Sequence, residues 1–271
     1  MRLAQSTIAF QDKHLAASDQ PFPTTISEIV DRWPELGWDG IEIWYPHVAG
    51  LDDPALDALA QQLRHQGLAV PMLSSYFNFT SSAEHAADSM AHGHEVIRRG
   101  HILGAEALRI FTGKHRSADA DEQQWQRCAD CLQELCDTAA AHGIVLALHM
   151  HDWNLIDTVA GTRRLINMVE RANLRVLSKP SIYAPEHLAV HEALADVLQG
   201  IHLTAAHTID GRSVPCRLAE SDLDWPACIA HLRQLGYDGW LTLNWMAANG
   251  WAMGRDAAAW LRTVLDELEE R

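Results

Sequence analysis

The stretch ELGWDGIEIW, residues 35–44, decides the fold, because it holds the end of one predicted helix and one predicted strand. Gly37 stands where helices commonly end, since glycine takes left-handed backbone angles without steric cost. Gly40–Tyr45 is a short apolar run interrupted only by Glu42, which is typical of a buried strand. The segment therefore predicts the junction between the helix of one βα unit and the strand of the next.

The same junction recurs along the whole chain. Four more glycines follow an amphipathic stretch and precede an apolar run: Gly67, Gly104, Gly143 and Gly236. Eight apolar runs alternate with the amphipathic stretches, and this alternation predicts parallel strands joined by helices. The expected strands are Arg2–Phe10, Gly40–Tyr45, Ala69–Ser75, Ala107–Thr112, Val145–His151, Arg175–Lys179, Gly200–Thr204 and Trp240–Asn244.

Helix starts are indicated by capping residues. Thr25 and Glu28 form a capping-box pattern, and Asp53 precedes a first-turn proline. Further N-caps are expected at Asp121, Asp157 and Asp224, and a last helix over Asp256–Glu269. Eight βα units without a glycine-rich phosphate loop after the first strand favour a closed barrel over an open doubly wound sheet. The fold class expected is α/β, a single (β/α)8 TIM barrel, with residues 1–271 as one domain.

Composition narrows the classes of partner. The 271 residues carry a formal net charge of −15, which opposes binding to nucleic acid. No apolar run reaches the length of about 18 residues that a membrane span needs, so no membrane partner is expected. The first residues do not form a signal-peptide pattern, and an odd number of cysteines, five, suits reduced thiols. A cytoplasmic location is therefore expected.

Several segments together resemble a known family. They are LGWDGIEIW (36–44), HGIVLALHMH (142–151), GIHLTAAH (200–207), LAESDLDW (218–225) and LGYDGWLTLNW (235–245). In order and spacing they are similar to strands and loops of the xylose isomerase-like TIM barrels, which include sugar isomerases and epimerases. The resemblance implies an active site at the C-terminal mouth of the barrel. It also implies Mn²⁺ or Mg²⁺ held by a glutamate on strand five, an aspartate on strand six, a histidine on strand seven and a glutamate on strand eight.

The strand ends depart from that ligand set. His149 stands at the position of the strand-five glutamate, and Asn244 at that of the strand-eight glutamate. Lys179 stands at the aspartate position, or Ser178 does if the register differs by one residue. Only His202 matches the family ligand. Hard divalent cations prefer anionic oxygen ligands, so we expect a degenerate metal site without the usual manganese or magnesium chemistry.

Three of these residues are the catalytic candidates: His149, Lys179 and Asn244. His149 can serve as a general base, because an unperturbed imidazole titrates near neutral pH. Lys179 can form a Schiff base if its pKa is depressed, or it can simply bind an anionic ligand.

The cofactor prediction depends on the histidines. His149 and His151 point to the same face of their strand, and His202 can join them at the barrel mouth. Three imidazoles suit zinc better than manganese or magnesium. The alternative is a polar pocket with no metal, in which the same histidines hydrogen-bond a ligand. His149 and His202 are thus candidate metal ligands, and the cofactor is either none or a divalent metal.

Substrate-binding candidates line the other strand ends: Glu42, Trp44, Arg109, His115, His151 and Trp245. Glu42 either faces the ligand or is a buried carboxylate paired with Arg109. The sequence therefore predicts an isomerase or epimerase of a sugar, sugar phosphate or polyol, with a small carbohydrate-like ligand and a possible homo-oligomer. The alternative is a catalytically inactive descendant that binds a ligand or a partner protein.

Overall fold

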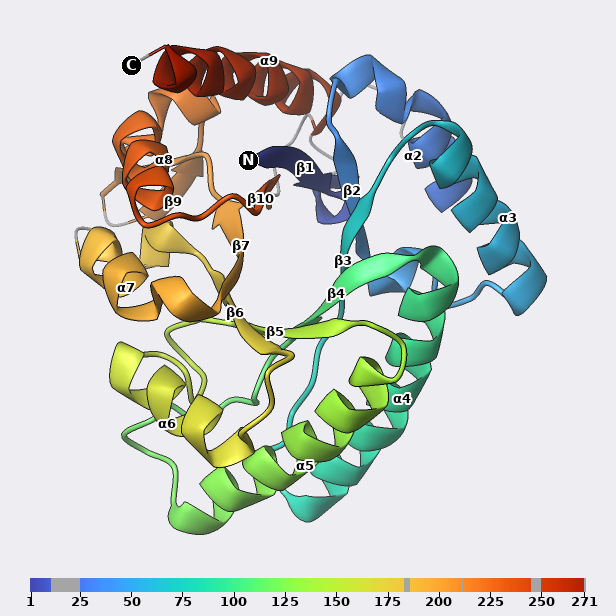
Figure 1. The fold of residues 1–271 in the computed structure, drawn as a ribbon, viewed down its shortest axis with the longest axis vertical. Helices are drawn as coiled ribbons and strands as arrows, with labels where there is room; N and C mark the ends of the chain where they lie inside the picture. Colours follow the sequence, from blue (N-terminus) through green and yellow to red (C-terminus); the bar gives the residue numbers. More distant parts are fainter. Residues whose placement is uncertain (11–24, 183–185, 211, 245–249, 271) are drawn as a thin grey trace.

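The strands close on themselves as a barrel (Figure 1). The computed structural model describes residues 1–10, 25–182, 186–210, 212–244 and 250–270. Over these ranges, eight parallel strands are hydrogen-bonded in the order β1-β10-β7-β6-β5-β4-β3-β2, and β2 returns to β1. The predicted (β/α)8 barrel is confirmed. The barrel strands are β1 (Arg2–Ser6), β2 (Gly40–Trp44), β3 (Val70–Ser74), β4 (Ala105–Ile110), β5 (Val145–His149), β6 (Leu174–Ser178), β7 (Leu198–Leu203) and β10 (Trp240–Leu243).

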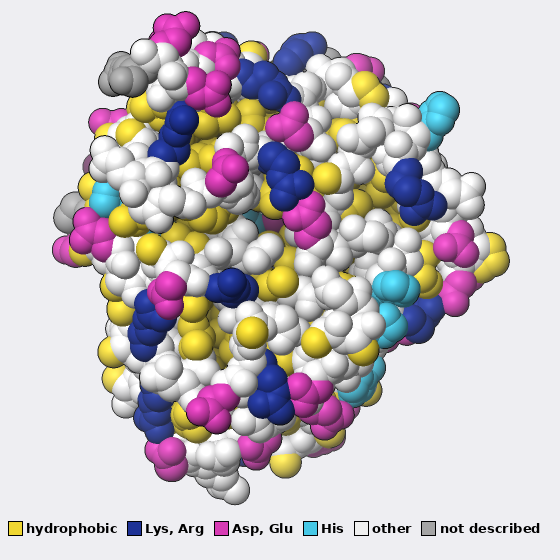
Figure 2. Space-filling model, in the orientation of Figure 1, with side chains coloured by type: hydrophobic (Ala, Val, Ile, Leu, Met, Phe, Trp, Pro, Cys, Tyr) yellow, Lys and Arg dark blue, Asp and Glu magenta, His cyan; other side chains and the backbone are white. Residues whose placement is uncertain are grey.

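Helices surround the barrel on its outer side (Figure 1). They are α2 (Ile26–Arg32), α3 (Asp53–His65), α4 (Ala83–Leu103), α5 (Glu122–Ala140), α6 (Val159–Val169), α7 (His187–Leu194), α8 (Trp225–Gln234) and α9 (Gly250–Glu269). None of the helices in the described ranges is long and apolar enough to cross a bilayer. On the face shown in Figure 2, basic side chains are interspersed with acidic ones and form no continuous basic surface.

Most of the glycines and capping residues expected at the helix ends are present. All five predicted glycines have positive φ, from 69° at Gly143 to 79° at Gly236. Thr25 caps α2 through a complete capping box, and Asp121 and Asp224 cap α5 and α8.

Two predicted caps are wrong. Asp52, not Asp53, caps α3, because its carboxylate accepts from the backbone N–H of Ala55 while Asp53 lies in the first turn. Thr158 caps α6 in place of Asp157, whose carboxylate instead accepts from the Arg116 guanidinium at 3.0 Å.

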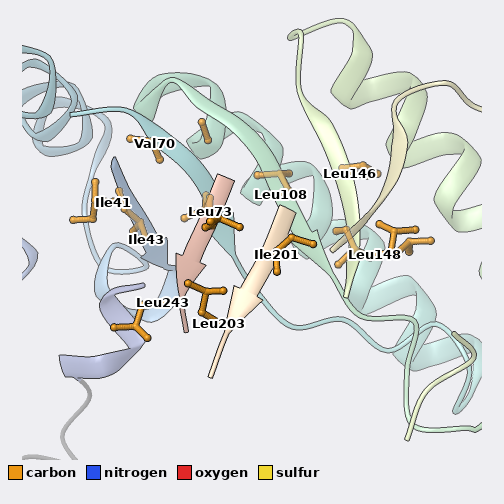
Figure 3. Close-up of a cluster of buried hydrophobic side chains, with 14 of the residues drawn as sticks. Ile41, Ile43, Val70, Leu73, Leu108, Leu146, Leu148, Ile201, Leu203 and Leu243 are labelled. Carbon is orange, nitrogen blue, oxygen red and sulfur yellow. The ribbon is translucent and has the colours of Figure 1, made fainter. Parts of the chain in front are cut away.

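The core lies between the barrel and its helices. Figure 3 shows strand residues of this layer, such as Ile41 and Ile43 on β2 and Leu146 and Leu148 on β5. Inside the barrel, a smaller buried cluster contains Met72, Ala107, Ala147 and Leu177. Alternation along each strand separates the two layers, so the residue after an outward-facing one points into the barrel.

The structure adds a hairpin that was not predicted. The strands β8 (Ala206–Ile209) and β9 (Arg212–Pro215) pair antiparallel beyond the end of β7. The dipeptide Asp210-Gly211 between them is a common hairpin signal. The segment is polar, however, and lacks the apolar run by which the barrel strands are recognised.

Candidate active site at the barrel mouth

Strand pairing decides which residue of β6 faces the barrel interior. His149 pairs with Leu177, which belongs to the interior cluster, whereas Ser178 pairs with the outward-facing Ile201. The Ser178 hydroxyl lies 3.1 Å from Nε2 of His191 on α7, outside the barrel. Lys179 therefore occupies the interior position at the mouth. The alternative register, with Ser178 at the ligand position, is wrong.

Burial of His191 gives a prediction for stability against pH. Burial, with repulsion from His187 and His231, lowers the pKa of His191 from 6.5 to about 4. Between pH 6.5 and pH 4, His191 is protonated in the unfolded chain but not in the folded chain. The stability that depends on neutral His191 is therefore fully present above pH 6.5 and is lost as pH falls towards 4. It corresponds to about 3 kcal/mol. His191→Gln is expected to flatten this part of the pH dependence in urea unfolding between pH 7 and 4, while the exposed His65→Gln leaves it unchanged.

Glu42 is the centre of a buried hydrogen-bond network. Its carboxylate accepts from the Ser74 hydroxyl at 2.7 Å and from the Asn244 amide at 3.3 Å, and its other oxygen lies 2.8 Å from Nε2 of His202. Glu42 and His202 are both fully buried. Burial alone would raise the pKa of Glu42, but His202, Arg109 and Ser74 outweigh it and lower the pKa to about 2. Glu42 is therefore a carboxylate at neutral pH.

His202 is oriented by that carboxylate. Burial lowers the pKa of His202, against the opposing attraction of Glu42. A neutral imidazole beside a carboxylate donates its Nε2–H and keeps Nδ1 as an unprotonated acceptor. Nδ1 of His202 is buried and has no hydrogen-bond partner among the described residues. In this arrangement Glu42 orients the His202 ring through Nε2, and Nδ1 is the nitrogen that can accept a proton.

His149 lies beside this pair, on β5. Its ring centroid is 4.9 Å from that of His202 and 4.9 Å from that of Phe111. The side chain is buried, and neither ring nitrogen has a partner among the described residues. Burial first, and then His202, Arg109 and Lys179, hold the pKa of His149 far below its usual value. His149 is therefore a neutral imidazole with two free nitrogens.

Two cationic side chains share the mouth. Arg109 is buried, and its Nε has no partner among the described residues. Its Nη2 makes one long bond, 3.5 Å, to the carbonyl oxygen of Ser75. Glu42 therefore binds His202, and the predicted alternative in which Arg109 pairs with Glu42 is wrong. Lys179 is half-buried, and burial together with Arg109 lowers its pKa.

An aromatic wall, formed by Tyr76, Phe111 and Trp153, stands next to Arg109. Phe111 stacks between the other two rings, with centroids 5.6 Å from Tyr76 and 4.9 Å from Trp153. The Arg109 guanidinium carbon lies 4.9 Å from the Tyr76 ring centroid and 5.0 Å from that of Phe111. Tyr76 is 50% exposed and Trp153 37% exposed, which is high for large aromatic rings. Phe111 and Trp153 were not predicted, although Trp153 follows His151 by two residues.

The other predicted binding residues differ in their surroundings. His151 contacts the Trp153 ring, 4.8 Å between centroids, and its Nδ1 is hydrogen-bonded to Asp152. Trp44 is half-buried at the end of β2, with its ring edge-on to His47. His115 is held by a 3.0 Å contact with the Thr80 hydroxyl, away from the Glu42 network. Trp245 lies outside the described residues.

The residues at the mouth do not fit a carboxylate-held divalent cation. In the described part of the chain, no three His, Cys, Asp or Glu side chains form a group that could hold a metal ion. His202 has Nε2 bonded to Glu42, His151 has Nδ1 bonded to Asp152, and Lys179 brings a positive charge to the place of the aspartate. Zinc at His149 and His202 stays a prediction.

Comparison with known proteins agrees with this architecture. A family model described as a xylose isomerase-like TIM barrel matches residues 30–266. The chain belongs to the xylose isomerase-like TIM barrel family. A 3-dehydroshikimate dehydratase of Bacillus anthracis is 24% identical over 179 residues, which are 65% of this chain and 60% of that relative. The match thus spans less than two thirds of the relative's length.

Solved structures share the whole barrel. The probable 3-DHS dehydratase AsbF of Bacillus anthracis has a TM-score of 0.80 at 20% identity, over 97% of this chain and 99% of that one. An L-ribulose 3-epimerase has a TM-score of 0.81 at 19% identity, over 99% of this chain and 96% of that one. At such low identities, these likenesses show the fold.

Proposed function

We propose that the chain is an isomerase- or epimerase-like enzyme that moves a proton next to the carbonyl group of a small carbohydrate-like substrate, without a manganese or magnesium site. The observation that carries the proposal is His149, a buried neutral imidazole with both nitrogens free among the described residues. Such a group is unprotonated at neutral pH, as a general base must be before it takes a proton from the substrate. The alternative, an inactive binding descendant, is an outcome of the test below.

The proposed step begins at a carbon beside the carbonyl group. His149 takes the proton from that carbon, and the electron pair of the broken C–H bond forms an enolate. The positive charges of Arg109 and Lys179 at the mouth stabilise the developing oxyanion through space, without either side chain having to bind that oxygen directly. Returning the proton to the opposite face of the same carbon gives an epimer. Returning it to the former carbonyl carbon gives an isomer, provided that the hydroxyl proton of the first carbon passes to the former carbonyl oxygen.

A second proton acceptor supports this assignment. Nδ1 of His202 is unpartnered among the described residues, and Glu42 holds the ring through Nε2. Two bases can serve two faces of one substrate carbon. Asn244 donates to Glu42 and so positions the base rather than transferring protons itself.

The activities for which the similar proteins are named are compatible with this first step. They include a 3-epimerase and a dehydratase. Removing a proton beside a carbonyl starts an epimerisation, and it also starts the loss of water from a β-hydroxy carbonyl compound. Proton abstraction is therefore the feature of the reaction that we propose for this chain.

Deuterium exchange tests the proposal before the product is known. The purified protein is incubated in D₂O with ketoses, ketose phosphates and keto sugar acids, and loss of proton signals beside the carbonyl is followed by NMR. We expect exchange with at least one of these compounds, and new product signals to separate isomerisation, epimerisation and dehydration. If none exchanges while some bind, the chain is a binding protein and the proposal is wrong.

Metal removal gives a further prediction. Dialysis against a chelator is expected to leave the exchange rate and the melting temperature unchanged, because the mouth lacks the carboxylate ligands that hard cations require. Metal content is measured by mass spectrometry on the wild type and on His202→Ala. Stoichiometric zinc in the wild type, lost in the variant together with the exchange, would contradict the prediction and support zinc at His149 and His202.

A further inference from the structure

The mouth of the barrel carries a charge opposite to that of the whole chain. The formal net charge of the protein is −15, yet two cations, Arg109 and Lys179, lie at the interior ends of β4 and β6. Neither forms an ion pair with a carboxylate in the described ranges. A buried positive charge is costly unless an anion lies close to it, so we expect a negatively charged group near these two side chains.

The nearby carboxylates supply this negative charge only in part, because Glu42 interacts electrostatically with Arg109 but forms no ion pair with it among the described residues. Glu42 accepts hydrogen bonds from Ser74 and Asn244 and lies at 2.8 Å from His202. Asp152 is exposed and is bonded to His151. Both carboxylates therefore have partners of their own, and both unpaired cations keep donor atoms for another group.

Arg109 is the stronger evidence of the two. Its side chain is 2% exposed, its Nε is unpartnered among the described residues, and its Nη2 makes a long hydrogen bond of 3.5 Å to the Ser75 carbonyl oxygen. The faces of Tyr76 and Phe111 hold the guanidinium without using its N–H donors. A guanidinium fixed in this way is pre-organised for a planar or tetrahedral oxyanion.

We propose that Arg109 and Lys179 bind an acidic group, a carboxylate or a phosphate, of the substrate, so that the ligand is a sugar acid or a sugar phosphate and not a neutral sugar. The proposal rests on the proposed function only in placing the ligand at this mouth. The exposed rings of Tyr76 and Trp153 form the wall against which the rest of the ligand lies. Within this site, the acidic group sets the position of the substrate carbon relative to His149.

Matched pairs of probes test the charge requirement by titration calorimetry. D-Gluconate is compared with D-glucitol, which has the same carbon chain without the carboxylate, and D-glucose 6-phosphate with D-glucose. Inorganic phosphate is the fifth probe. We expect one acidic member to bind at least about tenfold more tightly than its neutral partner. Which pair shows the difference tells a carboxylate ligand from a phosphate ligand.

Two lysine variants locate the site. Lys179→Met is expected to remove most of the preference for the acidic probe, whereas Lys114→Met, at an exposed lysine in the segment after β4, is expected to keep it. Arg109→Lys retains the positive charge but loses the paired N–H donors of the guanidinium, so we expect it to lose part of the preference for the acidic probe. The melting temperature of each variant shows that it is folded. Equal binding of acidic and neutral probes, including no binding by either, overturns the proposal. An unchanged preference in Lys179→Met overturns it as well.

The calorimetry and the deuterium exchange can reject the binding proposal and the catalytic proposal independently. Calorimetry requires no turnover, so a charge preference that Lys179→Met removes stands even if no compound exchanges deuterium. Conversely, exchange with a neutral ketose and no preference for acidic probes would leave the proposed function and remove this inference.

Discussion

His149→Ala is expected to lower the rate of deuterium exchange by about 10²- to 10⁴-fold, the usual contribution of a general base. The imidazole is the buried neutral group with two free nitrogens among the described residues, and alanine leaves nothing there to accept the proton. The variant is measured by NMR on the compound that exchanges fastest with the wild type.

A matched variant separates proton transfer from binding at this position. Glutamine can reach the position of a ring nitrogen and hydrogen-bond the ligand, but it does not accept a proton at neutral pH. His149→Gln is therefore expected to be as slow as His149→Ala while binding the same ligand. A wild-type exchange rate in folded His149→Ala would remove His149 from the mechanism. A wild-type exchange rate in His149→Gln but not in His149→Ala would show that His149 binds the substrate and does not transfer the proton.

His202→Ala is expected to destabilise the protein by about 2–3 kcal/mol, because it leaves the carboxylate of Glu42 buried without the Nε2–H donor of His202. The two side chains are fully buried, and their contact is 2.8 Å. The free energy of unfolding is measured in urea, with the melting temperature as a second readout.

The double variant tests whether the cost comes from the buried charge. Glu42→Gln removes the charge and keeps a side chain of the same shape that still accepts from Ser74. His202→Ala in the Glu42→Gln background is expected to cost less than His202→Ala alone, with a coupling of about 1–3 kcal/mol. Additive costs would show that the two side chains act independently, and would contradict a coupled network.

The substitutions at the strand ends form a consistent pattern. The resemblance implies cation-binding carboxylates at the ends of strands five, six and eight, and at those positions this sequence has His149, Lys179 and Asn244. Arg109 adds a second fixed positive charge, and Glu42 neutralises part of it from β2. The charge that a bound metal supplies elsewhere is, in the proposed mechanism, built into the chain.

Much of the barrel could be predicted from the sequence because its signals are local. The glycines that follow five of the amphipathic stretches, and the apolar runs after them, depend only on backbone angles and side-chain alternation. Errors remained where two adjacent residues compete for one role. Asp52 and Asp53 both suit an N-cap, as do Asp157 and Thr158, and the geometry of the first turn selects one of each pair.

The candidate site could be predicted only in part. His149, His202, Glu42 and Arg109 are recognisable because polar residues at the ends of apolar runs lie at the barrel mouth. Their pairing was not recognisable, because Glu42 and His202 are 160 positions apart. Phe111 and Trp153 were missed for a related reason: an aromatic residue in a loop has the same sequence signal whether it packs in the core or lines a site.

The stretch from residue 35 to residue 44 by itself determined that a helix ends and that a strand begins. The barrel was predicted from the eight alternating units along the whole chain. Residue identities, compared with those that the resemblance implies, also predicted a site without the family's metal-binding carboxylates. Tertiary structure alone decided that Lys179 rather than Ser178 faces the interior, because pairing with β5 and β7 sets the register. It also decided that Glu42 binds His202 and leaves Arg109 free, because closing the barrel brings side chains from opposite strands together.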